Sequence, residues 1–283
     1  MNSESELRLL SRLDHPSLGL GAGCGLPSGG NGFHPASLFA NGEQGAWYDP
    51  SDLSTMFQDP AGTIPAVVDG AIGLIRDKSG HGNHASQSTA ASKPTLRQSG
   101  GLYYLEFDGV DDFLSTNAID FSSTNKATVW LGLRKIIDTT ACIVELTANG
   151  DVNDGGFYIV PVSVGQVYKI SVGGNSGTKN QRSYGPYTAP ITQILSASFN
   201  SGSGDSVSAL SFRSNGVTVG GTNSSSSSDS GSLANAAIYL GRRGGVSLPF
   251  NGRIYGMIIR GGASDIVAIG SAEIWMNGKT SAY

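Results

Sequence analysis

The chain has 283 residues and a formal net charge of −4, from 18 basic and 22 acidic side chains. Because no basic stripe is visible along the sequence, a nucleic-acid partner is not expected. Charged residues make up only 14% of the chain and glycine contributes 41 residues, which favours short strands and tight turns over a helical bundle. The two cysteines, Cys24 and Cys142, are too few for a disulfide framework and are expected to stay unpaired.

The first 35 residues differ in composition from the rest. Residues 3–12 have the pattern of a short helix, and the glycine-rich stretch LGLGAGCGLPSGGNG that follows has no periodic signal. Apolar side chains are more frequent here than a solvated linker needs. We therefore expect residues 1–35 to form an extended docking arm rather than an idle linker, with its contacts made by Leu7, Leu10, Leu13, Leu18, Leu20, Leu26 and Phe33.

The N-terminus also bears on where the protein is made. It has neither the continuous apolar core nor the cleavage site of a signal peptide. No apolar run approaches the roughly 20 residues of a membrane span. We expect synthesis in a cytoplasm, with no membrane insertion.

Residues 36–283 have the pattern of one all-β domain. The stretch GAWYDPSDLSTMFQD contains a turn at Asp49 and Pro50, followed by one helical turn. A strand is expected at 72–75, and DKSGHGNHA forms a turn-rich loop. Further strands are expected at 103–107, 113–116, 127–135, 141–147, 156–161, 167–172, 192–199, 207–213, 236–241 and 250–260. Their spacing indicates antiparallel sheets in a sandwich or barrel. NSSSSSDSGS is expected to be an exposed loop, and Ser264 or Asp265 to cap a short C-terminal helix.

Three motifs resemble the laminin-G/concanavalin-A-like jelly-roll family. The loop DKSGHGNHA matches the family turn, and LEFDGVDDFL matches the strand end F-D-G-x-D-D-[YF]-[LV]. Near the C-terminus, a Leu-Gly strand and a second strand match at Leu240, Gly241, Gly252, Ile254, Met257, Ile259 and Arg260. The resemblance covers about residues 45–280 and implies an antiparallel β-sandwich jelly roll. The arm has no counterpart in this family, whereas WYDPSDLSTMFQD with the following loop is similar to modules of tailed-phage virion proteins.

The stretch LEFDGVDDFL places three aspartates within five residues. Asp108 and Gly109 form a turn dipeptide, since Asp bonds its own backbone and Gly adopts positive φ. Asp111 and Asp112 then cap the next strand or face solvent. The alternative is a Ca²⁺ site formed by Asp108, Asp111 and Asp112, because hard cations bind clustered carboxylates. The ordered ligand spacing of a dedicated calcium loop is missing, so the turn is the preferred interpretation and no cofactor is expected.

The sequence contains no recognisable enzyme motif. A glycan hydrolase needs two carboxylates in one cleft, about 5–9.5 Å apart, and none of the six glutamates lies in the E-x-D-x-x-E pattern of jelly-roll glucanases. Glu106 and Glu145 alternate with apolar neighbours, so each is expected on a solvated sheet face. His81 and His84 lie in a glycine-rich loop without an obvious third metal ligand. The chain is therefore predicted not to be an enzyme.

Two short stretches are candidate ligand-binding surfaces. Arg182, Tyr184 and Tyr187 flank the Gly–Pro turn of QRSYGPY and are expected to be exposed. Arg242 and Arg243 form a second basic loop in LGRRGG. Arginine and tyrosine are typical of interfaces, and sugar rings stack on aromatic faces.

The resemblance and the arm together predict a structural protein of a tailed-bacteriophage virion, as a tail fibre, baseplate or capsid-decoration module. The protein would be synthesised in the host bacterial cytoplasm and dock on other virion proteins through its arm. A homo-oligomer is expected because particle sites are symmetric, with a trimer as the assumed number. The displayed jelly roll would bind a host-surface glycan. A soluble glycan-binding lectin is the alternative, and a glycan hydrolase is less favoured.

Overall fold

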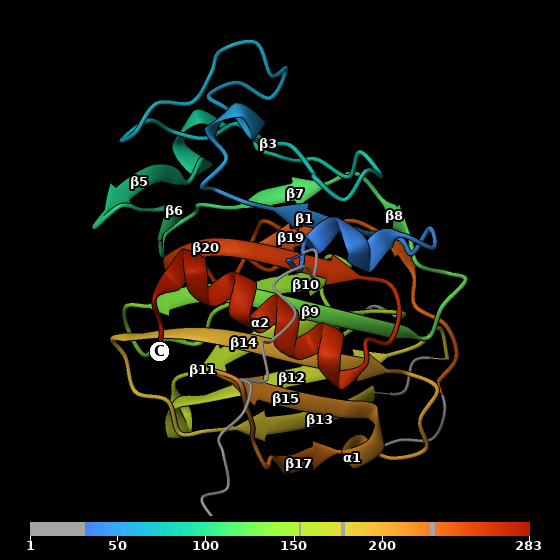
Figure 1. Ribbon diagram of the computed structural model, residues 1–283. Coiled ribbons are helices and arrows are strands. Elements are labelled where there is room, and N and C mark those ends of the chain that lie inside the picture. Colours follow the sequence, from blue (N-terminus) through green and yellow to red (C-terminus); the bar gives the residue numbers. More distant parts are fainter. Residues whose placement is uncertain (1–31, 153, 177–178, 227–229) are drawn as a thin grey trace, which may run out of the picture. The chain divides into compact units, whose positions relative to one another are not determined.

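A computed structural model describes residues 32–152, 154–176, 179–226 and 230–283 of the chain (Figure 1). The six leucines of the predicted docking arm lie outside these residues. Within the described part, the strands form two large antiparallel sheets and one small one. No helix in these ranges is long and apolar enough to cross a membrane.

The first sheet contains eight strands among the described residues. Its order is β16 (Val217–Thr218), β15 (Leu210–Ser214), β14 (Ile191–Asn200), β9 (Lys126–Lys135), β20 (Asn251–Arg260), β6 (Leu102–Asp108) and β5 (Thr95–Ser99), and β1 (Gly45–Tyr48) also pairs with β20. The long strands β9 and β20 lie at its centre. The sequence predicts a strand at each of these places, and the two contain some of its longest apolar runs.

The second sheet is formed by ten strands of the described ranges. Its order is β17 (Thr222–Ser225), β13 (Lys179–Tyr184), β12 (Val167–Gly173), β11 (Phe157–Val162), β10 (Val144–Leu146), β19 (Ile238–Leu240), β7 (Leu114–Thr116), β4 (Ala85–Ser86), β3 (Leu74–Ile75) and β2 (Met56–Phe57). A separate small pair joins β18 (Asn235–Ala236) to β8 (Ile119–Asp120).

Short helical turns and two α-helices accompany the strands. The 3₁₀ turns are η1 (Pro35–Phe39), η2 (Leu53–Thr55), η3 (Ala90–Ser92) and η4 (Val164–Gln166). Helix α1 (Ser206–Ala209) is short, whereas α2 (Ile266–Thr280) is the C-terminal helix that the sequence predicts. Of the two expected caps, Asp265 is the one that forms, since its side chain accepts a hydrogen bond from the Ala268 N–H at 2.7 Å.

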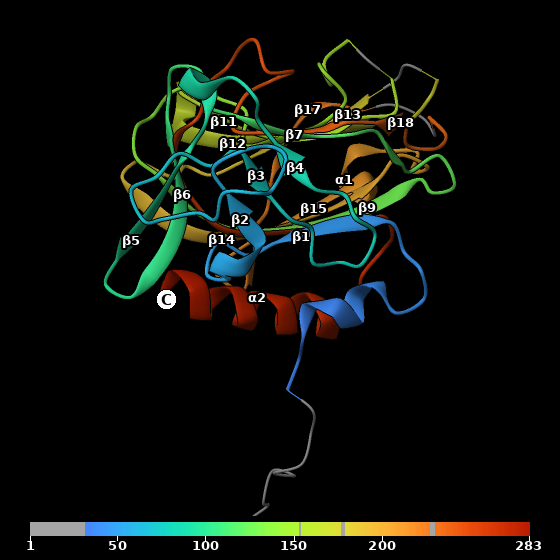
Figure 2. The same ribbon diagram turned by 90° about the horizontal axis from the view of Figure 1, so that it is seen from above.

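The two large sheets pack face to face around the main core, and α2 lies on the outer face of the eight-stranded sheet (Figure 2). Alternation along β6 explains the sandwich, because Leu105 and Phe107 point into the core whereas Glu106 points out. A second apolar cluster fills the space under α2, where Trp130 and Ile258 of the sheet meet Met276 of the helix. The fold is an all-β antiparallel jelly roll, as the sequence predicts.

Candidate functional site

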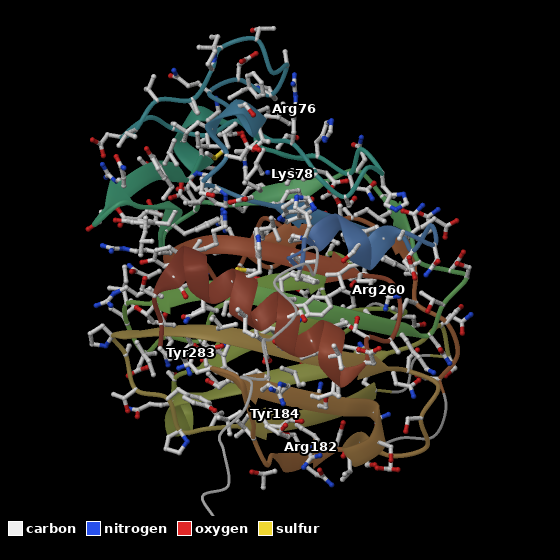
Figure 3. All side chains as sticks on the ribbon, viewed as in Figure 1. Arg76, Lys78, Arg182, Tyr184, Arg260 and Tyr283 are labelled. Atoms are coloured by element: carbon white, nitrogen blue, oxygen red, sulfur yellow. The ribbon has the colours of Figure 1, made fainter. Side chains whose placement is uncertain are left out.

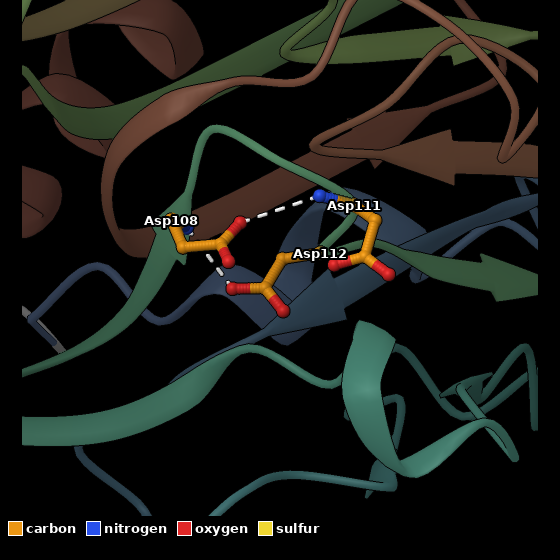
Figure 4. Close-up of side chains that lie close together, drawn as sticks. All are labelled: Asp108, Asp111 and Asp112. Carbon is orange, nitrogen blue, oxygen red and sulfur yellow. Dashed lines mark hydrogen bonds between the residues drawn. The ribbon is translucent and has the colours of Figure 1, made fainter.

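The acidic turn between β6 and β7 gathers three carboxylates (Figure 4). One ligand atom from each of Asp108, Asp111 and Asp112 lies within 4.8 Å of the others. Asp108 Oδ1 accepts hydrogen bonds from the Val110 N–H at 2.7 Å and the Asp111 N–H at 3.4 Å. Gly109 has a φ of +79°. These bonds and this dihedral angle form the tight turn that the dipeptide of Asp108 and Gly109 predicts.

Asp112 is the buried member of the turn, with 6% of its surface exposed. Its Oδ2 accepts a hydrogen bond from the Asp108 N–H at 3.0 Å. Burial raises the pKa of Asp112 to about 7, this hydrogen bond opposes the rise, and the carboxylates of Asp108 and Asp111 add to it. Asp111 is held from another direction, since its Oδ2 accepts a hydrogen bond from Ser92 Oγ at 2.9 Å. The turn therefore holds one carboxyl group that is partly protonated near neutral pH.

A pocket of about 320 Å³ opens beside this turn. Its polar lining consists of Thr95, Arg97, Glu106, Asp108, Asp112 and Asn251. Asn251 Nδ2 donates a hydrogen bond to the Asp108 carbonyl at 3.0 Å, and Arg97 Nε donates one to Glu106 Oε1 at 3.1 Å. The pocket, called here the acidic-turn pocket, therefore presents hydrogen-bond donors and acceptors to one space. Sequence reasoning identified the aspartates but not Arg97, which belongs to the preceding strand β5, or Asn251, which lies 143 positions after Asp108 in β20.

Glu106 lies on the outer face of its sheet, as predicted, but it is not a solitary solvated side chain. Its two oxygens accept hydrogen bonds from Arg97 Nε at 3.1 Å and Arg253 Nε at 3.2 Å. Arg253 also lies 4.5 Å from the ring centroid of Tyr104. The register of β5, β6 and β20 produces this cluster, because it aligns Glu106 with Arg253 and Tyr104 with Arg97.

Arg242, a predicted ligand-binding residue, supports the acidic turn from outside. Its Nη1 donates a hydrogen bond to the Asp111 carbonyl at 3.3 Å, and its Nη2 donates one to the Val246 carbonyl at 3.2 Å. The structure therefore joins the acidic turn to the basic loop, 131 positions apart in the sequence.

The neighbouring Arg243, the other predicted ligand-binding residue of this loop, is buried rather than part of a surface patch. Only 8% of its surface is exposed. Arg243 Nε lies 3.0 Å from Glu145 Oε2, and Nη1 lies 2.6 Å from Asp151 Oδ2. The prediction that Glu145 lies on a solvated face is also wrong, because this carboxylate is fully buried. Burial raises the pKa of Glu145, while the charge of Arg243 opposes the rise.

The predicted surface around the Gly–Pro turn is largely internal. Tyr184 is only 2% exposed, stacks on Phe212 at 4.8 Å between ring centroids, and donates a hydrogen bond to the Leu210 carbonyl at 3.2 Å. Tyr187 is half-buried and packs against the same core. Arg182, shown with Tyr184 in Figure 3, donates a hydrogen bond from Nη2 to the Gly221 carbonyl at 2.5 Å. The expected exposure fails because β13 continues through Tyr184 and turns this side chain inward.

Comparisons with known proteins identify the fold. No protein-family model and no curated protein sequence matches this chain. An arabinofuranosidase complexed with arabinofuranosyl-α-1,2-xylobiose is similar with a TM-score of 0.58 and 12% identity, over 88% of this chain and 65% of that chain. A structure of botulinum neurotoxin type C, which depends on interaction with two ganglioside molecules to enter cells, has a TM-score of 0.54 and 10% identity over 83% of this chain and 52% of its own.

The binding domain of paraclostridial mosquitocidal protein 1 has a TM-score of 0.51 and 14% identity, over 72% of this chain and 49% of that chain. This chain thus spans about half to two-thirds of the length of the solved chains that it matches. At such low identities the likeness concerns the arrangement of strands alone. These solved structures and the sheet order agree on one architecture, an all-β sandwich of the jelly-roll type.

Proposed function

We propose that this protein is a glycan-binding display module without catalytic activity. The observation that carries the proposal is the acidic-turn pocket, where Asp108, Asp112, Arg97 and Asn251 line one space of about 320 Å³. Sugar hydroxyls both donate and accept hydrogen bonds, so a lining that combines carboxylates with guanidinium and amide groups is suited to them. The ganglioside dependence of the neurotoxin and the oligosaccharide bound to the arabinofuranosidase support the proposal by analogy of fold.

A glycan array tests this proposal. We expect the full chain to bind a subset of glycans, and an Asp112→Asn or Asn251→Ala variant to lose at least tenfold in affinity. Val110→Ala is a matched control, because this exposed residue lies in the same turn but does not line the pocket. A wild-type chain that binds no glycan on the array would refute the proposal.

The finer proposal is that this module is displayed on a tailed-bacteriophage particle as a homo-oligomer, with a trimer as the working assumption. It is supported by the motif resemblance and by the composition of the arm. The prediction that Phe33 contacts a partner loses support, because this side chain packs against the cluster under α2 that contains Leu38 and Trp47. The proposed anchor is therefore the segment with the six leucines from Leu7 to Leu26.

Deletion of residues 1–31 tests the anchor. The shortened chain should keep the thermal stability of the full chain but fail to enter particles, whereas unchanged incorporation would contradict the anchoring role. A soluble lectin predicts instead that glycan binding is retained and that no particle incorporates either form. Electron cryo-microscopy of the particle that carries the protein is the direct measurement.

A glycan hydrolase is the second candidate, and one observation favours it. The acidic-turn pocket contains Asp112, whose pKa is about 7, together with the carboxyls of Asp108 and Glu106. A carboxyl of raised pKa beside a second carboxyl is the pairing used for general acid catalysis on glycosides. Release of reducing sugar that disappears in Asp112→Asn would favour the hydrolase. Binding without release favours the display module.

A further inference from the structure

Two strands meet end to end along one edge of β20. Strand β6 pairs with residues 251–254 of β20, and β1 pairs with residues 257–260. The end of β1 and the start of β6 therefore approach each other in the middle of this edge. The C-terminal turns of α2 lie beside the junction, and a pocket of about 340 Å³ opens there. We call it the junction pocket.

The lining of the junction pocket comes from three separate segments. Ser51 follows β1, Tyr103 belongs to β6, and Trp275 and Lys279 belong to α2. Among the three tryptophans, Trp47 and Trp130 are 3% and 0% exposed and cannot contact a ligand. Trp275 is half-buried, and it is the tryptophan that lines the pocket. The pocket thus offers indole surface to a ligand, whereas the ring of Tyr103 packs against the main core. Its volume lies within the range of roughly 300–1,000 Å³ that small-molecule sites have.

The polar part of the junction pocket is fixed in place. Lys279 Nζ donates hydrogen bonds to Asp49 Oδ2 at 3.0 Å and to Ser51 Oγ at 2.6 Å. Its ammonium group also lies 4.7 Å from the ring centroid of Trp275. An ammonium group has three N–H donors, so these two hydrogen bonds leave one for a ligand. An oriented donor beside an aromatic side chain is the combination that a ring with hydroxyl groups requires.

Two glycines leave room for such a ring. A Cβ atom built on Gly101 or on Gly278 meets no atom within 4 Å, and both residues line the pocket. Gly101 has a φ of +81°, so the turn between β5 and β6 favours glycine there. Gly278 has no such backbone requirement and lies in the last turns of α2, where glycine is a poor helix former.

We propose that the junction pocket is a second carbohydrate site, which binds a neutral pyranose ring against Trp275. The apolar C–H face of the sugar packs on the aromatic surface, and its hydroxyls bond Lys279 and Ser51. This inference rests on the proposed glycan-binding function. The two pockets are lined by opposite ends of β6, and their nearest lining residues there, Tyr103 and Glu106, are three residues or roughly 10 Å apart at about 3.3 Å per residue. One sugar ring therefore cannot occupy both.

The test fills the pocket without removing any group that lines it. Gly278→Phe places a ring in the pocket, and Gly270→Phe is the matched control because Gly270 is on the same helix, also has no atom within 4 Å of its added Cβ, and does not line the pocket. The probes are a panel of methyl hexopyranosides, titrated against tryptophan fluorescence, and a glycan array. We expect Gly278→Phe to lose at least tenfold in affinity, and Gly270→Phe to match the wild type.

Other outcomes overturn the inference in distinguishable ways. If Asp112→Asn abolishes array binding while Gly278→Phe leaves it and the fluorescence response unchanged, the junction pocket is not a sugar site and the proposed function stands. If the wild-type chain responds to no sugar in either assay, both are refuted. If both glycine variants lose binding equally, the effect belongs to the helix rather than to the pocket. Thermal melts of both variants establish that each is folded.

Discussion

Replacement of Asp112 by asparagine should change how stability depends on pH. The pKa of this carboxyl is about 7 in the folded chain, against 3.8 for the ordinary side chain. The folded state therefore holds a proton that the unfolded state releases above pH 4. The stabilisation is fully present below pH 3.8 and is lost as the pH rises through 7. A difference of roughly three units corresponds to about 4 kcal/mol, because each unit contributes about 1.4 kcal/mol.

Urea denaturation of both proteins at pH 4.5, 6, 7 and 8 measures this effect. The asparagine side chain is neutral at every pH and can still accept the hydrogen bond from the Asp108 N–H. Contributions from other titrating groups cancel in the difference between the two proteins. We expect the unfolding free energy of Asp112→Asn relative to the wild type to rise with pH, by about 3–4 kcal/mol between pH 4.5 and 8.

Two results would refute this reasoning. A difference that stays constant over the whole range would mean that Asp112 has an ordinary pKa. A difference that falls with pH would mean that the folded state prefers the charged carboxylate.

Calcium at millimolar concentration separates the two interpretations of the turn. Stabilisation of the wild type at pH 8 that is absent in the variant would favour a cation site. The tight-turn interpretation predicts no such stabilisation.

Three further predictions concern the interior. Glu145→Ala should destabilise the fold by about 3–5 kcal/mol because it leaves the buried guanidinium of Arg243 with only one of its two acidic partners. Adding Arg243→Met to the same chain should recover part of this loss, as measured by urea denaturation. Tyr184→Phe should cost about 1 kcal/mol in the same assay, and no loss would contradict the buried hydrogen bond. Gly252→Ala brings a Cβ within 2.5 Å of a β9 carbonyl and should lower the melting temperature, whereas Gly204→Ala should not.

The central strands were the most predictable part of the fold. The expected strands at 127–135 and 250–260 agree with β9 and β20 to within one residue at each end. Both combine a long apolar run with β-branched residues, so their local pattern and their burial agree. Strand β13 was missed because its polar stretch KNQRSY lacks this pattern, although Tyr184 in it is buried. Its inward position depends on pairing with β12, which local sequence does not reveal.

The candidate site was predictable only where its residues are neighbours in sequence. Asp108, Asp111 and Asp112 lie in one turn, so their proximity follows from turn chemistry. Glu145 and Arg243 are 98 positions apart, and alternation alone placed Glu145 on a solvated face. That face is covered in the folded protein, and burial of a carboxylate is tolerated because an arginine neutralises it. Partners of this kind come from topology, which a single sequence does not contain.

The pairing of β1 with β20 also constrains the order in which the chain folds during synthesis. Gly45 pairs with Arg260, so β1 cannot form its hydrogen bonds until a strand 215 positions later has been synthesised. At roughly 5–20 residues per second, synthesis of that interval takes about 10–40 s. β20 also separates β9 from β6, so the eight-stranded sheet cannot close before β20 has been synthesised. A nascent chain stopped before residue 251 would expose both strand edges, which makes it a substrate for chaperones and prone to aggregation.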